Sequence, residues 1–123
     1  MDIGVVGAGS WGTALADLLA RIGHQVTLWA YESDLVLRMR RERENDLFLP
    51  DINLHENLCF TDSLAEAVAD RELVLLVPPS QLMRQVFCRL LPYLKKDPVL
   101  VSASKGIENE SLMTMSQVLE EEL

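Results

Sequence analysis

The chain has 123 residues, of which 49% are hydrophobic and 24% charged, and its formal net charge is −8 at pH 7. This length and apolar content predict one folded domain over residues 1–123 and exclude an intrinsically disordered segment. The acidic balance argues against a nucleic-acid partner, because phosphate contacts need a concentrated basic surface.

The first thirty residues alternate between extended and helical patterns. An apolar run at 3–6 predicts a buried strand, and Gly7-Ala-Gly-Ser-Trp-Gly12 follows it directly. From Thr13 onward, apolar residues at i, i+3, i+4 and i+7 predict an amphipathic helix that ends at Gly23. The apolar stripe expected to face the core consists of Leu15, Leu18, Leu19 and Ile22. A second strand is predicted at 26–29.

The glycine spacing G-x-G-x-x-G between a strand and a helix predicts a dinucleotide-binding loop. Gly7 allows a tight turn, Gly9 lets a pyrophosphate approach the backbone, and Gly12 lets the helix pack closely against the sheet. The first N–H groups of the helix and its dipole would face the phosphates. The alternative is a glycine-rich turn that binds nothing.

The rest of the chain continues the alternation of strands and helices. Ser33 is expected to cap a helix to about Glu44, in which arginines and glutamates interleave as on a solvated, ion-paired face. After a connection at 45–57, we expect a strand at 58–60 and a short helix capped by Asp62. A strand at 73–77, a helix from Ser80 and a strand at 99–101 follow. The last expected helix starts near Ser111 and has Leu112, Met115 and Leu119 on one side. This order predicts an α/β fold of Rossmann type: a doubly wound parallel sheet in three layers, α/β/α, with strand order 3-2-1-4-5.

The last residues suggest that the chain continues. Glu120, Glu121 and Glu122 lie in the final turn of the last predicted helix, where the helix dipole disfavours negative charge. A sheet of this kind usually has a sixth strand, which these residues do not supply. We therefore expect the chain to be the front part of a longer protein, truncated before that strand.

The predicted strand order brings three loops around one cleft, outside the carboxyl ends of the first and fourth strands. These loops are 7–12, 78–81 and 102–106, and Lys105 is the only cation on them. A lysine beside Gly106 at the end of a strand is placed for a phosphate or a reactive oxygen, or is simply an exposed lysine near a turn.

The end of the second strand bears on the choice of cofactor. An acidic side chain there would hold a ribose 2′-hydroxyl, whereas an arginine would accept a 2′-phosphate. Glu32 is acidic and no arginine follows the second strand until Arg38, which favours NAD over NADP unless Ala30 occupies the deciding position. Tyr31 either lays its ring against the adenine or is a surface aromatic.

Several functions and sites are not indicated. Cys59 and Cys88 form neither a C-x-x-C pattern nor a cluster with histidines, so we expect reduced, buried thiols and no metal site. Neither His24 nor His55 belongs to an arrangement with Ser, Cys or Asp that would indicate nucleophilic catalysis. The chain has no signal-peptide pattern and no apolar stretch long enough to cross a bilayer. These features predict a cytoplasmic protein without membrane insertion.

Five short segments carry a family resemblance: Gly7-Ala-Gly-Ser-Trp-Gly-Thr-Ala-Leu-Ala16, Val26-Thr-Leu-Trp29, Phe48-Leu-Pro50, Val77-Pro-Pro-Ser80 and Ser104-Lys-Gly-Ile-Glu108. Together and in this order they resemble the NAD-dependent glycerol-3-phosphate dehydrogenases, over essentially the whole chain. The resemblance implies a bacterial-type enzyme that reduces dihydroxyacetone phosphate to sn-glycerol 3-phosphate with NADH or NADPH, for phospholipid synthesis. It is compatible with a homodimer of the full-length enzyme.

The resemblance also implies roles for individual residues. Ser10 and Trp11 match positions that bind the cofactor together with the glycine loop, and Tyr31 matches a position beside the adenosine half. Lys105 matches a position that touches both cofactor and substrate. The proton-donating lysine and the residues that bind the substrate phosphate belong to a helical second domain outside these 123 residues. The family often has arginine or histidine where Tyr31 and Glu32 stand, so the cofactor is NAD or NADP.

Two other functions fit the same glycine loop. One is a non-catalytic module that senses NAD(H), such as those that gate ion channels, although such a module needs no lysine after its fifth strand. The other is a different two-domain reductase, acting for instance on a hydroxy acid or on ketopantoate.

Overall fold

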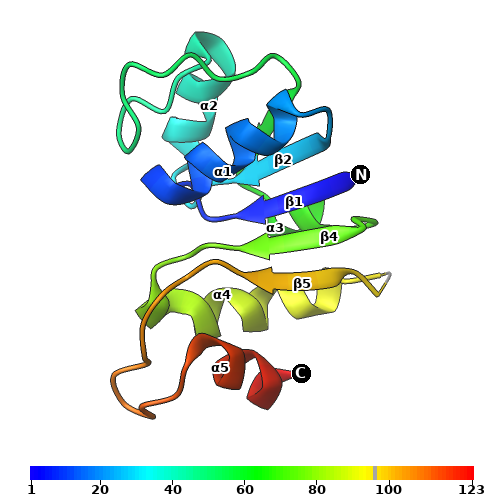
Figure 1. The fold of residues 1–123 in the computed structure, drawn as a ribbon, viewed down its shortest axis with the longest axis vertical. Helices are drawn as coiled ribbons and strands as arrows, with labels where there is room; N and C mark the ends of the chain where they lie inside the picture. The colour runs from blue at the N-terminus through cyan, green and yellow to red at the C-terminus, as the bar shows by residue number, and fades with distance from the viewer. Residues whose placement is uncertain (96) are drawn as a thin grey trace.

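The computed structural model describes residues 1–95 and 97–123 of the chain. Its centre is a five-stranded sheet in the order β3-β2-β1-β4-β5, in which every neighbouring pair is parallel (Figure 1). The strands are β1 (Asp2–Val6), β2 (Gln25–Trp29), β3 (Leu58–Thr61), β4 (Leu73–Leu76) and β5 (Val99–Ser102). The strand order predicted from the sequence is confirmed.

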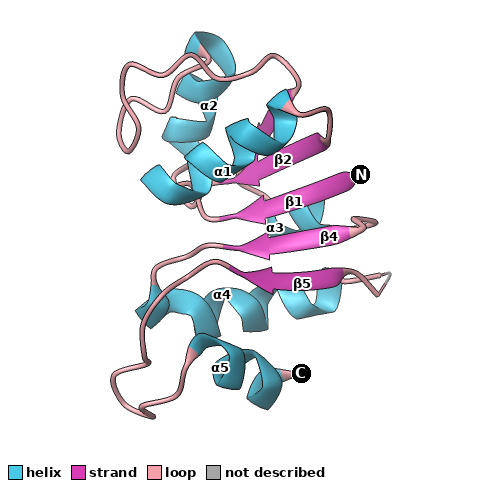
Figure 2. Cartoon of the chain, in the orientation of Figure 1, coloured by secondary structure: helices cyan, strands magenta, loops and turns pink. Residues whose placement is uncertain are grey.

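Helices cover both faces of the sheet (Figures 1 and 2). They are α1 (Ser10–Arg21), α2 (Ser33–Glu42), α3 (Leu64–Val68), α4 (Met83–Leu90) and α5 (Met115–Glu122), with 3-10 turns at Ser80–Leu82 and Leu91–Tyr93. One core cluster joins α1 and α2 to the sheet, and a second joins α3, α4 and α5 to the other face. Because successive strand residues point to opposite faces, Val5 lies in the first cluster and Val6 in the second. The three-layer α/β/α fold is therefore as predicted.

The face that α1 presents to the sheet differs from the prediction. Its buried residues are small or polar: Gly12, Thr13, Ala16, Asp17 and Ala20. Leu18 and Ile22 are 54% and 65% exposed, although the leucine stripe was expected to face the core. Only Leu15 and Leu19 of that stripe pack, partly buried, against the first cluster. Small side chains let the helix approach the sheet closely, and this close approach outweighs the area that the leucines would bury.

Three helix starts also differ from the sequence prediction. The side chain of Ser63, rather than Asp62, caps α3 by accepting a hydrogen bond from Glu66 N at 3.2 Å. Helix α2 begins at Ser33, with Glu32 as the preceding residue. Helix α5 begins only at Met115, because Thr114 and Gln117 form a capping box there. The residues before it form a loop, in which Leu112 is 74% exposed and has φ of +59°.

Both cysteines are exposed, contrary to the expectation of buried thiols. Cys59 lies on the edge strand β3 between the buried residues Leu58 and Phe60, and Cys88 lies on α4 but is not among its buried residues. Among the described residues, no helix has the length and hydrophobicity required to cross a membrane.

The arginines of α2 behave only partly as the sequence predicted. Arg38 and Arg41 form surface ion pairs, with Asp34 and Asp46 in one case and Glu42 in the other. Arg40, in contrast, donates to the backbone carbonyl of Phe60, at 2.7 Å from Nη2. Arg43, just beyond the helix, donates to Leu58 O at 2.8 Å. These two side chains therefore bind the helix to strand β3 rather than forming a solvated face.

Candidate functional site

A cleft of about 620 Å³ opens outside the carboxyl ends of the strands. It is lined by segments 7–12, 77–80 and 103–105, which come from the three loops that the sequence predicted to meet there. Every residue predicted to bind the cofactor lines this cleft: Gly7, Gly9, Ser10, Trp11, Gly12, Tyr31 and Lys105. Other lining residues are Ala8, Trp29, Glu32, Phe48, Leu82 and Val86. The fold thus brings together residues almost one hundred positions apart.

Two of the three loop glycines are required by the protein's own packing. Gly7 has φ of +123°, and a Cβ there would lie 2.6 Å from the carbonyl oxygen of Val77. A Cβ on Gly12 would lie 1.9 Å from the carbonyl oxygen of Gly7. A side chain at either position would therefore force β1, α1 and the loop after β4 apart.

Gly9 differs from these two glycines. Its φ is −68°, which any residue can adopt, and apart from Gly9 and its two chain neighbours no atom of the described residues lies within 4 Å of where its Cβ would be. Neither strain nor packing within the chain therefore requires glycine at this position. The space beside it belongs to the cleft, where a bare backbone can approach a ligand closely.

The start of α1 leaves backbone donors available at the same place. Gly9 precedes the helix and caps it with no side chain, and the first turn contains no acidic residue. The first bond of the helix runs from Thr13 N to Gly9 O at 3.0 Å, so the N–H groups of residues 10–12 have no helical acceptor. Such N–H groups, together with the positive end of the helix dipole, bind anions such as a diphosphate.

Aromatic side chains follow the end of β2. Tyr31 is 72% exposed, and its ring lies edge-on to Trp29, with centroids 6.4 Å apart and planes at 78°. Trp29 is buried and donates its indole N–H to Asp62 O at 3.0 Å. Its ring nevertheless forms part of the cleft wall, as does Phe48 from the connection after α2. No role in a site was predicted for Phe48, because no periodic pattern in the connection at 45–57 indicates which of its side chains face the cleft.

The two charged side chains of the cleft lie beyond the ends of two different strands. Among its described lining residues, Lys105 is the only basic side chain and Glu32 the only acidic one. Glu32 follows β2 and Lys105 follows β5, which are three strand spacings apart, or roughly 14 Å. The cleft therefore offers a carboxylate at one side, backbone donors in the middle and an ammonium group at the other side.

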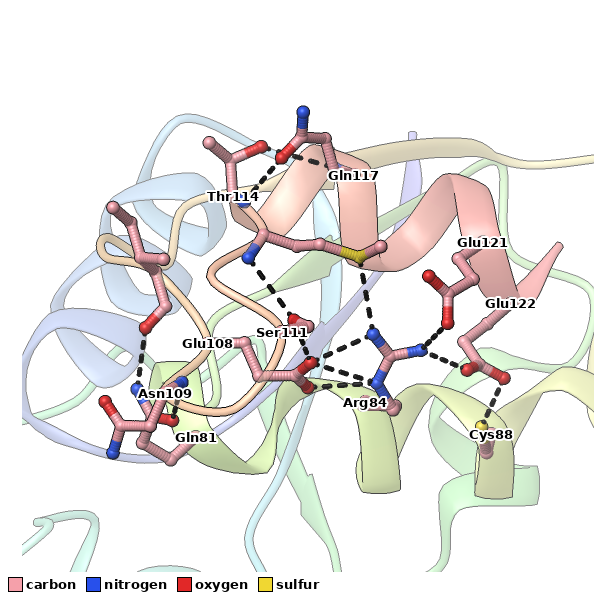
Figure 3. A network of polar contacts seen from close by, with 12 residues as sticks. Gln81, Arg84, Cys88, Glu108, Asn109, Ser111, Thr114, Gln117, Glu121 and Glu122 are labelled. Atoms are coloured by element: carbon pink, nitrogen blue, oxygen red, sulfur yellow. Dashed lines mark hydrogen bonds and ion pairs between the residues drawn. The ribbon is translucent and has the colours of Figure 1, made fainter.

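The loop that carries Lys105 is bound to the start of α4 (Figure 3). Gln81 Nε2 donates to Ile107 O at 2.9 Å, and its Oε1 accepts from Asn109 N at 2.8 Å. Arg84 pairs with Glu108 at 2.9 Å, which lowers the pKa of that carboxyl below its ordinary value through hydrogen bonding. Ser104 Oγ also donates to Pro78 O. These contacts, which the sequence did not predict, fix the loop after β5 against the loop after β4.

Comparison with known proteins identifies the family. A family model for the NAD-dependent glycerol-3-phosphate dehydrogenase N-terminus matches residues 2–123. The chain belongs to this glycerol-3-phosphate dehydrogenase family. It is 59% identical over 123 residues to a glycerol-3-phosphate dehydrogenase [NAD(P)+] of Syntrophotalea carbinolica, and 60% identical over 119 residues to one of Citrifermentans bemidjiense. The match covers 100% and 97% of this chain.

Solved structures agree with the assignment. The crystal structure of glycerol-3-phosphate dehydrogenase from Coxiella burnetii superposes with a TM-score of 0.91 at 36% identity, over 98% of this dehydrogenase-family chain. A ketopantoate reductase from Ralstonia eutropha shares the fold, with a TM-score of 0.78 at 23% identity. The chain spans only about 37% of the length of its Syntrophotalea relative and of the Coxiella protein.

Proposed function

We propose that this chain is the cofactor-binding part of a glycerol-3-phosphate dehydrogenase that reduces dihydroxyacetone phosphate to sn-glycerol 3-phosphate, a precursor of phospholipids. The observation that carries the proposal is Gly9: beyond its two chain neighbours, no atom of the described residues lies within 4 Å of its Cβ position, beside N–H groups of α1 that have no helical acceptor. Open space and free donors at one point of a cleft fit a bound diphosphate.

The residues of the chain would divide the binding between them. The glycine loop and the N–H groups after Ser10 hold the diphosphate, while Trp11 and Tyr31 contribute exposed aromatic surface to the cleft. Lys105 places an ammonium group at the other side, where it neutralises substrate charge and orients the ketone. When bound, the nicotinamide cofactor supplies the hydride, which goes to the ketone carbon. A proton must reach the carbonyl oxygen, and we assign its donor to a part of the whole protein outside this chain.

The charges near β2 favour NAD(H) over NADP(H). Glu32 lines the cleft at the end of β2, where its carboxylate can accept from ribose hydroxyls but would repel a 2′-phosphate. The arginines that could oppose this repulsion are bound elsewhere: Arg38 to Asp34 and Asp46, Arg40 to Phe60 O, and Arg43 to Leu58 O. The replacement Glu32→Gln should lower the ratio of NADH affinity to NADPH affinity about tenfold, which corresponds to roughly 1.4 kcal/mol.

Calorimetric titration of the whole protein with NADH tests the binding proposal. The wild type should bind saturably, and Gly9→Val should abolish binding while circular dichroism and thermal unfolding stay close to wild type. The side chain would project into the path of the diphosphate rather than into the core. Unchanged affinity in Gly9→Val would remove the proposed role of the loop.

Turnover tests the catalytic part of the proposal separately. The whole protein should oxidise NADH in the presence of dihydroxyacetone phosphate, whereas the 123-residue chain alone should bind cofactor and turn over nothing. Lys105→Ala should raise the KM for the substrate, and a variant as active as wild type would contradict its role. Binding of NADH without turnover by the whole protein would point instead to a sensor module, and preference for ketopantoate to another reductase.

A further inference from the structure

Asn45 lies outside the cleft but contacts the glycine loop directly. Its side chain is fully buried, and Nδ2 donates to Ala8 O at 2.9 Å and to Thr13 Oγ1 at 2.8 Å. Thr13, which is also fully buried, donates from Oγ1 to the same carbonyl at 3.2 Å. The carbonyl of Ala8, between the first two glycines of the loop, therefore accepts two side-chain hydrogen bonds from the side away from the ligand space.

These bonds fix the orientation of one peptide group. The peptide between Ala8 and Gly9 is trans, so its C=O and N–H point in opposite directions. Holding the carbonyl against Asn45 and Thr13 directs the Gly9 N–H away from both residues. Gly9 lines the cleft whereas Asn45 and Thr13 do not, and no described residue accepts a backbone hydrogen bond from the Gly9 N–H.

The same amide also holds a second wall of the cleft. Asn45 Oδ1 accepts from Phe48 N at 3.0 Å, and Asn45 O accepts from Leu49 N at 2.9 Å. The turn that places Phe48 against the cleft is therefore closed by Asn45. The side chain of Asn45 thus joins the turn that carries Phe48 to the glycine loop, where Ala8 lies 37 residues before Asn45.

We propose that Asn45 is a positioning residue for dinucleotide binding, which fixes the peptide between Ala8 and Gly9 so that the Gly9 N–H is aimed at the diphosphate. This inference rests on the proposed cofactor-binding function. Only a carboxamide fits the site: two N–H donors and one acceptor are all used, and no ionised carboxylate can donate to the Ala8 carbonyl. Thr13 acts through the same carbonyl and supports the same orientation.

The test measures NADH and adenosine affinity in the whole protein, with the wild type and variants at Thr13 and Asn45. Thr13→Val keeps the shape but removes the hydroxyl, so NADH should bind about tenfold more weakly, as expected for roughly 1.4 kcal/mol. Adenosine, which has no phosphate, should bind as it does to wild type. Thr13→Ser keeps the hydroxyl and should restore NADH affinity.

Asn45→Ala should weaken NADH binding at least as much as Thr13→Val does. The double variant should bind NADH only slightly more weakly than Asn45→Ala alone, because both side chains act through the Ala8 carbonyl. Thr27→Val is the matched control: Thr27 is buried in the middle of β2, beside Gly4, and does not line the cleft, so this change should leave NADH affinity as in wild type. If Asn45→Ala does not fold, the Thr13 pair decides.

Two results would overturn the inference. One is unchanged NADH affinity in folded Thr13→Val and Asn45→Ala; the other is an equal loss for NADH and adenosine in Thr13→Val. Absence of NADH binding by the wild type would instead refute the proposed function itself, so the two failures are distinguishable.

Discussion

Arg84 on α4 binds Glu108 beyond β5 through two nitrogens on one edge of its guanidinium group: Nη2 lies 2.9 Å from Oε1, and Nε lies 2.9 Å from Oε2 (Figure 3). The same guanidinium contacts Glu121 at 2.8 Å and also Glu122, both in α5. The negative charge at the end of α5, which the sequence marked as unfavourable, is therefore compensated within the fold. One arginine holds the Lys105 loop and the last helix together.

Arg84→Gln should loosen the loop after β5 without unfolding the sheet, because it removes three ion pairs while leaving both core clusters intact. The backbone bonds from Glu108 N to Met113 O and from Leu112 N to Glu108 O should open more often. Hydrogen exchange of these two amides should be about tenfold faster than in wild type. Arg89→Gln, at an exposed arginine of the same helix, is the control, and equal exchange in both variants would contradict the prediction.

The Arg84–Glu108 pair should make stability depend on pH. Hydrogen bonds from Arg84 and Ser111 lower the pKa of the Glu108 carboxyl from its ordinary value of 4.5. A carboxyl with a lowered folded pKa stabilises the fold above the ordinary value, and this contribution disappears as the pH falls through the lowered value. The urea midpoint of wild type should exceed that of Glu108→Gln at pH 7, and the difference should shrink below pH 4.5.

The matched control for this titration is Glu110→Gln, at an exposed glutamate two residues away. It should show no comparable pH-dependent difference. A Glu108→Gln difference that stayed constant from neutral to acid pH would mean that the ion pair does not contribute.

Cys88 should be a slow nucleophile although it is exposed. Its thiol donates to Glu122 Oε2 at 3.0 Å, and this hydrogen bond, with burial second, raises the pKa of Cys88 above its ordinary value of 9.0. Glu122→Gln removes the negative acceptor, so alkylation by iodoacetamide at pH 8 should become several-fold faster. Peptide mapping can follow Cys88 with Cys59 as the internal reference. An unchanged rate at Cys88 would exclude control by Glu122.

Alanine should lower the free energy of unfolding much more at Gly12 than at Gly9, although both glycines belong to the same loop. Gly12→Ala places Cβ 1.9 Å from Gly7 O, so α1 must move, and the free energy of unfolding should fall by about 3 kcal/mol or more. Gly9→Ala meets no atom within 4 Å and should lower it by less than about 1 kcal/mol. Urea denaturation of both variants measures the difference. Similar losses would mean that the loop is not packed as described.

The topology could be predicted from the sequence because it depends on local patterns. Apolar runs separated by helical stretches identified all five strands, and the glycine loop after the first strand favoured the strand order of a Rossmann-type sheet, which the structure has. The glycine loop was equally local, and its three glycines predicted where a ligand could approach. Lys105 could be predicted because loops that follow neighbouring parallel strands meet at one edge of the sheet.

The face of α1 could not be predicted in the same way. Periodicity favoured Leu18 and Ile22 as core residues, whereas Ala16 and Ala20 occupy that position and the two larger side chains are exposed. Hydrophobic spacing measures how much area a helix could bury, but the separation of helix and sheet decides which side chains fit between them. That separation is set by the contact of Gly12 with Gly7.

The sequence by itself determined the order of the elements, the doubly wound sheet and the position of the glycine loop, because each depends on neighbours within a few residues. Only the tertiary structure decided which remote side chains support the cleft. Asn45 reaches Ala8 across 37 residues and Arg84 reaches Glu108 across 24, and no local pattern encodes either contact. Such hydrogen bonds arise where packing brings two segments to within about 3 Å, which is a property of the folded chain as a whole.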